Sequence, residues 1–102
     1  MRILSLLGIA EKAKGVASGE YQTEKAVKEG RAHLVIVAED ASDNTKKNFS
    51  DMCAYYEVPY YEYAEKESLG HCIGKDYRSS LAITNPGIAR SLRNYLNIET
   101  TE

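Results

Sequence analysis

The feature that most constrains the fold is an uninterrupted apolar run, Leu34–Ala38, near the middle of the chain. A strand that alternated apolar and polar residues would have one face in water, whereas a continuous run indicates a strand covered on both faces. The run therefore predicts a buried central strand over residues 33–38. A chain of 102 residues forms one domain and can bury the core that such a strand needs without a disulfide or a metal.

Helices are predicted on both sides of this strand. Helical spacing of apolar residues predicts a first helix over residues 3–13, with Gly15 as its stop, and a strand stub follows at 16–17. A second helix begins at Ser18-Gly19 and ends at Gly30. Ser42 or Asp43 can cap a third helix, which ends at Val58-Pro59. Its core-facing positions follow helical spacing at Phe49, Met52, Cys53 and Tyr56.

The C-terminal part continues the alternation of strands and helices. It contains a strand at 60–63, a short helix at 65–71, a loop at 74–78, a strand at 79–83 and a last helix that starts at Asn85-Pro86. We expect a single domain over residues 1–98 and a flexible tail over 99–102. The pattern predicts a three-layer α/β/α sandwich with a small central mixed sheet. Ligands of such folds meet loops at one edge of the sheet, so the loops 15–19, 39–43 and 74–78 are candidates.

Two features bear on cellular location and on metals. The N-terminal apolar stretch is interrupted by Glu11 and Lys12, and no run reaches the ~18 residues of a membrane span, so we expect a cytoplasmic protein without membrane contact. Cys53 and Cys72 should then stay reduced. The adjacent His71 and Cys72 lack the ~2–4-residue separation of close zinc ligands. We therefore expect a metal-free monomer with no cofactor.

Charge is unevenly distributed along the chain. The net charge is −2, yet residues 1–31 carry six basic and four acidic groups, residues 32–67 three and eight, and residues 68–102 four and three. Both ends are mildly basic and the middle is acidic. Because electrostatic recognition is local, a basic face on such a protein can still bind RNA.

Catalysis is not expected. Glu39 and Asp40, with His71, could be read as acid and base, but acidic residues at a strand end are more often solvated or helix-capping groups. The sequence contains no nucleophile elbow, phosphate-binding loop or dinucleotide fingerprint. We therefore expect a protein that is not an enzyme.

The start of the second helix favours RNA binding on physical grounds. Ser18-Gly19 precedes unpaired N–H groups and the positive end of the helix dipole. Gln22 and Lys25 lie one turn apart, so an amide that can read a base edge stands beside a cation that can neutralise phosphate. Lys14 and Lys28 are expected to widen this cationic margin. A plain solvated face is the alternative interpretation.

The loop 74–78 adds cations around an aromatic residue. Lys75 and Arg78 flank Tyr77, a mixture that can grip and stack on irregular RNA, although a plain turn is the alternative. We expect Arg78 to act as a flexible phosphate-binding cation that supports binding without choosing the RNA.

Several motifs in order resemble the small ribosomal proteins that bind kink-turn RNA, in particular their bacterial branch. The resemblance covers residues 2–97. The segments that carry it are Lys14-Gly15, Gly19–Val27, Leu34–Ala41, Val58–Tyr60 and Leu69–Asp76. It implies that the second helix enters the widened major groove at the sheared G·A pairs, while the later loop covers the bulged nucleotides.

The resemblance also transfers roles residue by residue. Gly19, Gln22 and Lys25 match the family motif, with Gln22 where the family often has Glu. Asp76 and Tyr77 occupy the loop position of an acidic and an aliphatic residue. Tyr21 departs from the usual Asn, and Glu20 adds a negative charge. The full candidate RNA-binding set is Lys14, Gly19, Glu20, Tyr21, Gln22, Lys25, Lys28, Glu39, Asp40, Lys75, Asp76, Tyr77 and Arg78.

A second hypothesis is a protein-interaction module on the same fold, acting in ribosome or translation-related assembly. Its contact surface would combine the acidic middle of the chain with the tyrosines Tyr55, Tyr60, Tyr61 and Tyr63. Such tyrosines are more often core and strand residues with a wet hydroxyl. Steep weakening of binding by salt would identify the RNA binder.

Overall fold

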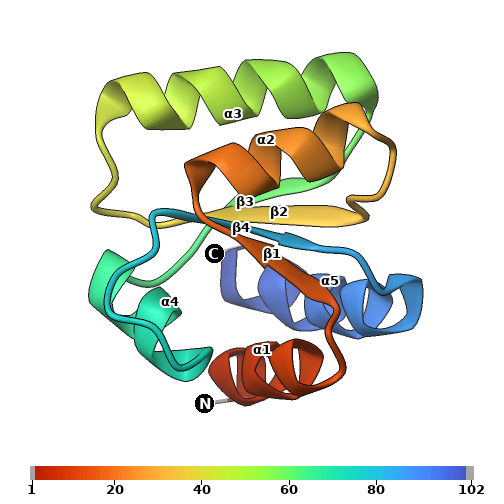
Figure 1. Cartoon of the computed structure of the whole chain (residues 1–102), viewed down its shortest axis with the longest axis vertical. Coiled ribbons are helices and arrows are strands. Elements are labelled where there is room, and N and C mark those ends of the chain that lie inside the picture. Colours follow the sequence, from red (N-terminus) through yellow and green to blue (C-terminus); the bar gives the residue numbers. More distant parts are fainter. Residues whose placement is uncertain (1, 101–102) are drawn as a thin grey trace.

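The structure of the protein, a computed structural model, describes the backbone of residues 2–100 and the side chains of residues 2–98. Helices and strands alternate along it (Figure 1). They are α1 (Arg2–Lys12), β1 (Val16–Ser18), α2 (Glu20–Lys28), β2 (Leu34–Val37), α3 (Asp43–Tyr56), β3 (Tyr60–Glu62), α4 (Lys66–Cys72), β4 (Ser80–Ile83) and α5 (Pro86–Thr100).

The sheet has the strand order β1-β4-β2-β3. Strand β4 pairs antiparallel with both β1 and β2, whereas β3 pairs parallel with β2. Every residue of β2 and of β4 is buried. The predicted central strand with two covered faces is confirmed, and the sheet is mixed as expected.

Helices cover both faces of this sheet, as Figure 1 shows. Helices α2 and α3 lie on one face, and α1, α4 and α5 lie on the other. Large side chains from both helical layers are fully buried against the sheet, among them Leu7, Phe49, Leu69 and Leu92. The three-layer α/β/α sandwich is confirmed.

The end of α1 differs from the prediction. Lys14, not Gly15, takes the left-handed conformation, with φ of 59°. The Lys14 N–H donates to the Glu11 carbonyl at 2.9 Å, and the Gly15 N–H to the Ala10 carbonyl at 2.8 Å, which together make a Schellman-type end. Position 15 favours glycine for another reason, because a Cβ there would lie 3.1 Å from the Cβ of Asn85.

The starts of the later helices follow the predicted caps. The Ser42 hydroxyl accepts from the Thr45 N–H at 3.1 Å, and Asn85 Oδ1 accepts from the Ile88 N–H at 3.0 Å. Helix α5 continues to Thr100, so residues 99 and 100 of the expected tail have helical backbone. No glycine or proline follows Gly87 to end the helix. Residues 101–102 of the expected tail lie outside the described residues.

Both cysteines are free thiols in the structure. Burial raises the pKa of Cys53 to about 11, and it also raises the pKa of the half-buried Cys72. Both side chains are therefore protonated at neutral pH. Among the described residues, no group of three or more His, Cys, Asp or Glu could hold a metal ion. In the same part of the chain, no helix is both long and apolar enough to cross a membrane.

Candidate nucleic-acid interface

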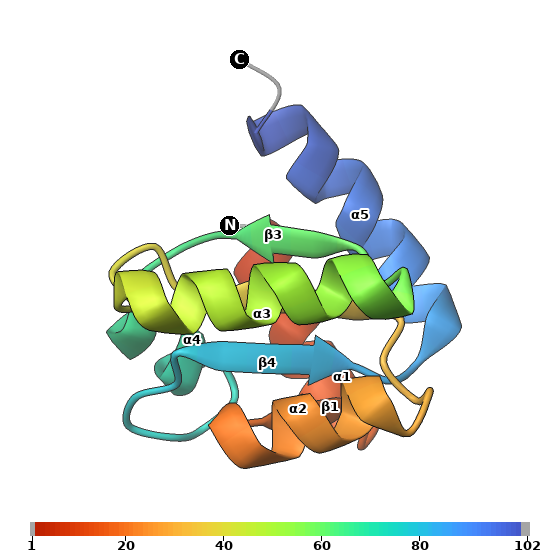
Figure 2. The same ribbon diagram turned by 90° about the horizontal axis from the view of Figure 1, so that it is seen from above.

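Four loops meet where the strands end on one side of the sheet, a region that we call the proximal edge (Figure 2). It comprises residues 18–20, 38–42, 63–66 and 74–79. The strand register brings them together, because Ser18 pairs with Leu81 and Val37 pairs with Ser80. The opposite end of the sheet, which we call the distal edge, comprises residues 13–15, 29–33, 57–59 and 84–86.

The start of α2 is a helix N-terminus without a side-chain cap. Gly19 is the N-cap with φ of 93°, a backbone conformation that favours glycine. Its own N–H donates to the Ser80 carbonyl at 3.0 Å. In the described part of the chain, the next three N–H groups, of Glu20, Tyr21 and Gln22, have no acceptor. This helix end therefore presents free donors and the positive end of its dipole at the surface.

Two buried hydroxyls hold the first turn of α2 on the sheet. Thr23 and Ser80 are both fully buried. The Ser80 hydroxyl donates to Thr23 Oγ1 at 3.3 Å, and the Thr23 hydroxyl donates to the Ala17 carbonyl at 3.4 Å. The helix start is thereby joined to both β4 and β1, which fixes where its N–H groups point.

The loop 74–79 packs tightly on α4. The Lys75 N–H donates to the Gly70 carbonyl at 2.8 Å, and the Arg78 N–H donates to the Lys66 carbonyl at 3.1 Å. A Cβ on Gly70 would lie only 2.7 Å from the Asp76 carbonyl oxygen. Gly70 thus permits a close backbone approach that sets the shape of the loop.

Arg78 joins this loop to the start of α2. Its Nε donates to the Ser18 hydroxyl at 3.2 Å, and its Nη1 donates to the Tyr77 carbonyl at 2.6 Å. The side chain is half-buried and held by these two hydrogen bonds, so it is less mobile than expected, and its contact with phosphate stays a prediction. Its guanidinium is held by the residue next to Gly19, which links the loop to the helix start. Lys75, Asp76 and Tyr77 remain exposed, and Tyr77 is 64% accessible.

The outer side of the first α2 turns carries the predicted polar pair. Gln22 and Lys25 are exposed on successive turns, and neither has an ion pair or side-chain hydrogen bond within residues 2–98. Tyr21, next to Gln22, is 71% accessible. An amide, a cation and an aromatic ring are therefore available to a ligand at this end of the helix.

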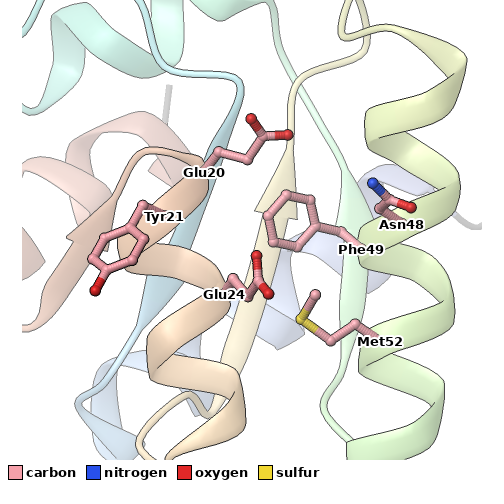
Figure 3. A pocket seen from close by; sticks show the side chains of 6 residues that line it. All are labelled: Glu20, Tyr21, Glu24, Asn48, Phe49 and Met52. Carbon is pink, nitrogen blue, oxygen red and sulfur yellow. The ribbon is translucent and has the colours of Figure 1, made fainter.

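A groove of about 470 Å³ separates α2 from α3 (Figure 3). Glu20 and Glu24 line it from α2, and Asn48, Phe49 and Met52 line it from α3. The two carboxylates would repel phosphate in this groove. An anionic ligand is thus directed away from this groove toward the helix tip, and Lys25 itself lies in a second hollow with Tyr21, Glu24, Lys28 and Glu29.

Two of the predicted cations lie elsewhere. Lys14 precedes β1 at the distal edge, where the Gly15 carbonyl accepts from the Thr84 N–H. Lys28 is the last residue of α2, about 12 Å along the helix from Glu20, and its Nζ lies 2.7 Å from Glu24 Oε2. Lys14 therefore lies away from the face that carries Gln22 and Lys25, whereas Lys28 lines a hollow together with Lys25, and its part in RNA binding stays a prediction. Lys14 and Lys28 are near Gly19 in the sequence but not in space, because β1 and α2 extend away from the turn between them.

Glu39 and Asp40 lie at the proximal edge with different roles. Asp40 Oδ1 accepts from the Lys66 N–H at 2.8 Å, so its carboxylate caps α4. Glu39 is exposed, and its N–H donates to the Ala64 carbonyl at 2.7 Å. The helix-capping interpretation is confirmed for Asp40, although the capped helix is α4 and not the nearby α3.

The tyrosines of the protein-interaction hypothesis do not form one exposed surface. Tyr60, Tyr61 and Tyr63 are half-buried and pack against the core, and the Tyr60 hydroxyl donates to Glu62 Oε2 at 2.8 Å. The Tyr61 hydroxyl donates to Asn97 Oδ1 on α5. Of the four, Tyr55 is the exposed one, at 79%. This arrangement does not favour the second hypothesis.

Residues that build the proximal edge were absent from the predicted set. Ser18, Thr23 and Ser80 hold α2 and Arg78 in place, and Gly70 shapes the loop. A glycine inside a helical pattern was a usable signal, because such a residue often marks a close packing contact. The hydroxyl contacts join positions 57 and 60 residues apart, and no local pattern indicates them.

With this geometry established, the class of protein follows from comparison. Residues 1–93 match the Ribosomal protein L7Ae/L30e/S12e/Gadd45 family, and the chain belongs to that family. It is similar to the RNA-binding protein YlxQ of Bacillus subtilis (strain 168), with 42% identity over 97 residues, covering 95% of this chain and 97% of that protein. It is also similar to the RNA-binding protein YlxQ of Enterococcus faecium, with 34% identity over 95 residues, covering 93% and 91%. The predicted resemblance to the bacterial branch is thereby confirmed.

Solved structures share the fold. A protein with unknown function from Bacillus halodurans C superposes with a TM-score of 0.90 at 37% identity, covering 93% of this chain and 96% of that chain. The Giardia lamblia 15.5kD RNA binding protein superposes with a TM-score of 0.80 at 22% identity, covering 93% and 84%. The second likeness shows the fold alone.

Proposed function

We propose that this protein is a non-catalytic RNA-binding protein that recognises kink-turn RNA at the proximal edge. The observation that carries the proposal is the uncapped N-terminus of α2, with Gln22 and Lys25 exposed beside it and the loop 74–79 fastened to it through Arg78 and Ser18. The names of the YlxQ relatives, which describe RNA-binding proteins, support an RNA ligand.

Each exposed group has a role in this proposal. The free N–H groups and dipole of α2 attract an electronegative edge of the RNA. Gln22 reads a base with both ends of its amide, and Lys25 contacts phosphate. Tyr21 and Tyr77 offer rings on which unstacked bases can rest. Arg78 acts indirectly, because it fixes the loop against Ser18.

The cellular setting forms part of the proposal. We propose a cytoplasmic monomer that binds ribosomal or other structural RNA, with ribosomal or translation-related proteins as further partners. Exposed donors on a rigid helix end suit structured RNA better than the charges of a flexible basic tail would.

The test compares a kink-turn duplex with a straight duplex of the same length and composition. Gln22→Ala should weaken kink-turn binding by ~1–3 kcal/mol and leave straight-duplex binding almost unchanged. Lys25→Ala should weaken both and reduce the salt slope by about one. Lys47→Ala is the matched control, because Lys47 lies on α3 and is paired with Asp51.

Equal affinity of the unmutated protein for the two duplexes would contradict the proposal. A loss of equal size for Gln22→Ala on both duplexes would contradict the assignment of base reading to Gln22. Thermal unfolding should match the unmutated protein for all three variants, since exposed helical positions usually change stability by less than ~0.5 kcal/mol.

A further inference from the structure

The distal edge carries a cluster of basic groups that the proposed site does not use. Arg90 and Arg93 are exposed on neighbouring turns of α5. Together with Pro86, Ala89 and His33, which directly precedes β2, they line a hollow of about 210 Å³. Residues from two elements therefore converge on one concave basic surface, which we call the α5 patch.

Little negative charge opposes this patch. Within residues 2–98, neither Arg90 nor Arg93 forms an ion pair, and α5 has no acidic residue from Pro86 to Ile98. Of the acidic residues at this edge, Glu29 is bound to Arg31 at 2.9 Å, and Glu57 ends α3. Lys14 enters the sheet from the same edge and adds to the positive charge. On a chain with a net charge of −2, this local excess is a specific feature.

The contacts of the two arginines do not explain them as structural residues. Arg78 shows what a positioning arginine looks like in this fold, half-buried and bonded to Ser18 and to a carbonyl. Arg90 and Arg93 have no hydrogen bond in the described part of the chain and point their exposed side chains to solvent. Their guanidinium groups are free to form the forked hydrogen bonds that suit phosphate.

We propose that the α5 patch is a second RNA-contact surface, which binds backbone phosphates of a segment flanking the one held at the proximal edge. The choice of RNA as the partner rests on the proposed function. The two surfaces lie at opposite ends of the sheet in a molecule of 29 × 29 × 26 Å. A short kink-turn duplex reaches the proximal edge alone, whereas a longer folded RNA that passes around the protein reaches both.

The proposal gives a quantitative difference between short and long RNAs. Each neutralised duplex phosphate adds about 0.9 to the slope of log affinity against log salt. Two phosphates bound by Arg90 and Arg93 would therefore steepen the slope by about 1.8. Between 50 and 200 mM salt, this corresponds to an additional loss of about tenfold in affinity.

The experiment measures the affinity and salt slope of Arg90→Gln/Arg93→Gln on three probes. The probes are a kink-turn with minimal arms, a kink-turn with extended flanking RNA on both arms, and a polyglutamate peptide. Lys47→Gln is the control, because it removes an exposed charge from α3, which lies on the opposite face of the sheet from α5. Circular dichroism melts verify that both variants are folded.

We expect the Arg90→Gln/Arg93→Gln variant to bind the extended RNA more weakly at 50 mM salt and to lose the extra slope, so that raising the salt to 200 mM costs it about tenfold less affinity than it costs the unmutated protein. It should bind the minimal kink-turn as the unmutated protein does. Equal slopes for the unmutated protein on the two RNAs, or an equal loss in the control variant, would overturn the α5 patch as an RNA surface. So would a loss confined to polyglutamate, which would indicate an acidic protein partner.

A different comparison of RNA probes tests the proposed function. That function fails when the minimal kink-turn and a straight duplex bind equally, a result that does not involve Arg90 or Arg93. The α5 patch fails when the preference for the kink-turn is present but extending the RNA changes nothing. The two proposals can thus fail independently.

Discussion

Gly70→Ala tests whether one close backbone approach shapes the interface. In a helix interior, alanine is normally favoured over glycine by about 1 kcal/mol. Here the new Cβ would lie 2.7 Å from the Asp76 carbonyl oxygen and 2.8 Å from the Tyr77 nitrogen, which are backbone atoms that cannot rotate away. Overpacking of this kind costs ~1–3 kcal/mol, and the hydrogen bond from Lys75 to Gly70 adds about 1 kcal/mol when it is lost.

The favourable and unfavourable contributions give a net destabilisation of about 1–3 kcal/mol. For a domain of this size, each kcal/mol lowers the melting temperature by about 4–8 °C. The shift of the loop should also move Tyr77 and the Arg78 contact to Ser18, so kink-turn affinity should fall in the folded variant. Thermal unfolding and a kink-turn titration measure the two effects.

Gly87→Ala is the matched control for this prediction. Gly87 also lies in a helix, but its added Cβ would meet only Asn85 Oδ1 at 3.4 Å. The same chemical change should therefore stabilise the protein or leave it unchanged, and RNA binding at the proximal edge should stay the same. If Gly70→Ala raised the melting temperature as Gly87→Ala does, the close approach could not be what shapes the loop.

Three further predictions test separate features of the structure. Arg78→Ala should reduce the preference for a kink-turn over a straight duplex, because it releases the loop from Ser18; an equal loss on both duplexes in a titration would instead indicate a phosphate contact. Lys14→Gly should raise the free energy of unfolding by about 1 kcal/mol, because it removes a left-handed non-glycine residue. Denaturant unfolding checks this, and affinity for a minimal kink-turn should not change. Asp40→Ala should destabilise the protein by ~0.5–2 kcal/mol through loss of the α4 cap, whereas Glu39→Ala should have little effect on the same unfolding curve.

Local patterns were sufficient to predict the layers of this fold. The run Leu34–Val37 is buried on both faces, and the apolar stripe of α3 places Phe49 and Cys53 in the core, as its spacing predicts. Asn85 and Pro86 start α5 through a cap and a fixed φ, which are properties of a few adjacent residues. Such features depend on short-range physics, so they can be inferred before any tertiary contact is known.

The candidate site was predictable only in part, because several of its contacts join residues that are far apart in the sequence. Gln22 and Lys25 share a helix face by periodicity, and the structure has both exposed there. The role of Arg78 depends on a partner 60 residues away, and that of Asp40 on a helix 26 residues later. Lys14 was misplaced because the extended strand β1 separates it from Gly19. Long-range contacts of this kind leave no trace in residue spacing.

The strand order has a consequence for when the interface forms during synthesis. Strand β1 has one neighbour in the sheet, β4, and the two are separated by most of the chain. Closing so large a loop is entropically slow, and it cannot begin until Ile83 has left the ribosome. The N-terminal segment that carries Gly19 and Gln22 therefore emerges early but has neither Ser80 nor Arg78 to hold it. A nascent chain that ends before β4 should therefore lack the proposed selectivity for kinked RNA, because it cannot form the contacts to Ser80 and Arg78.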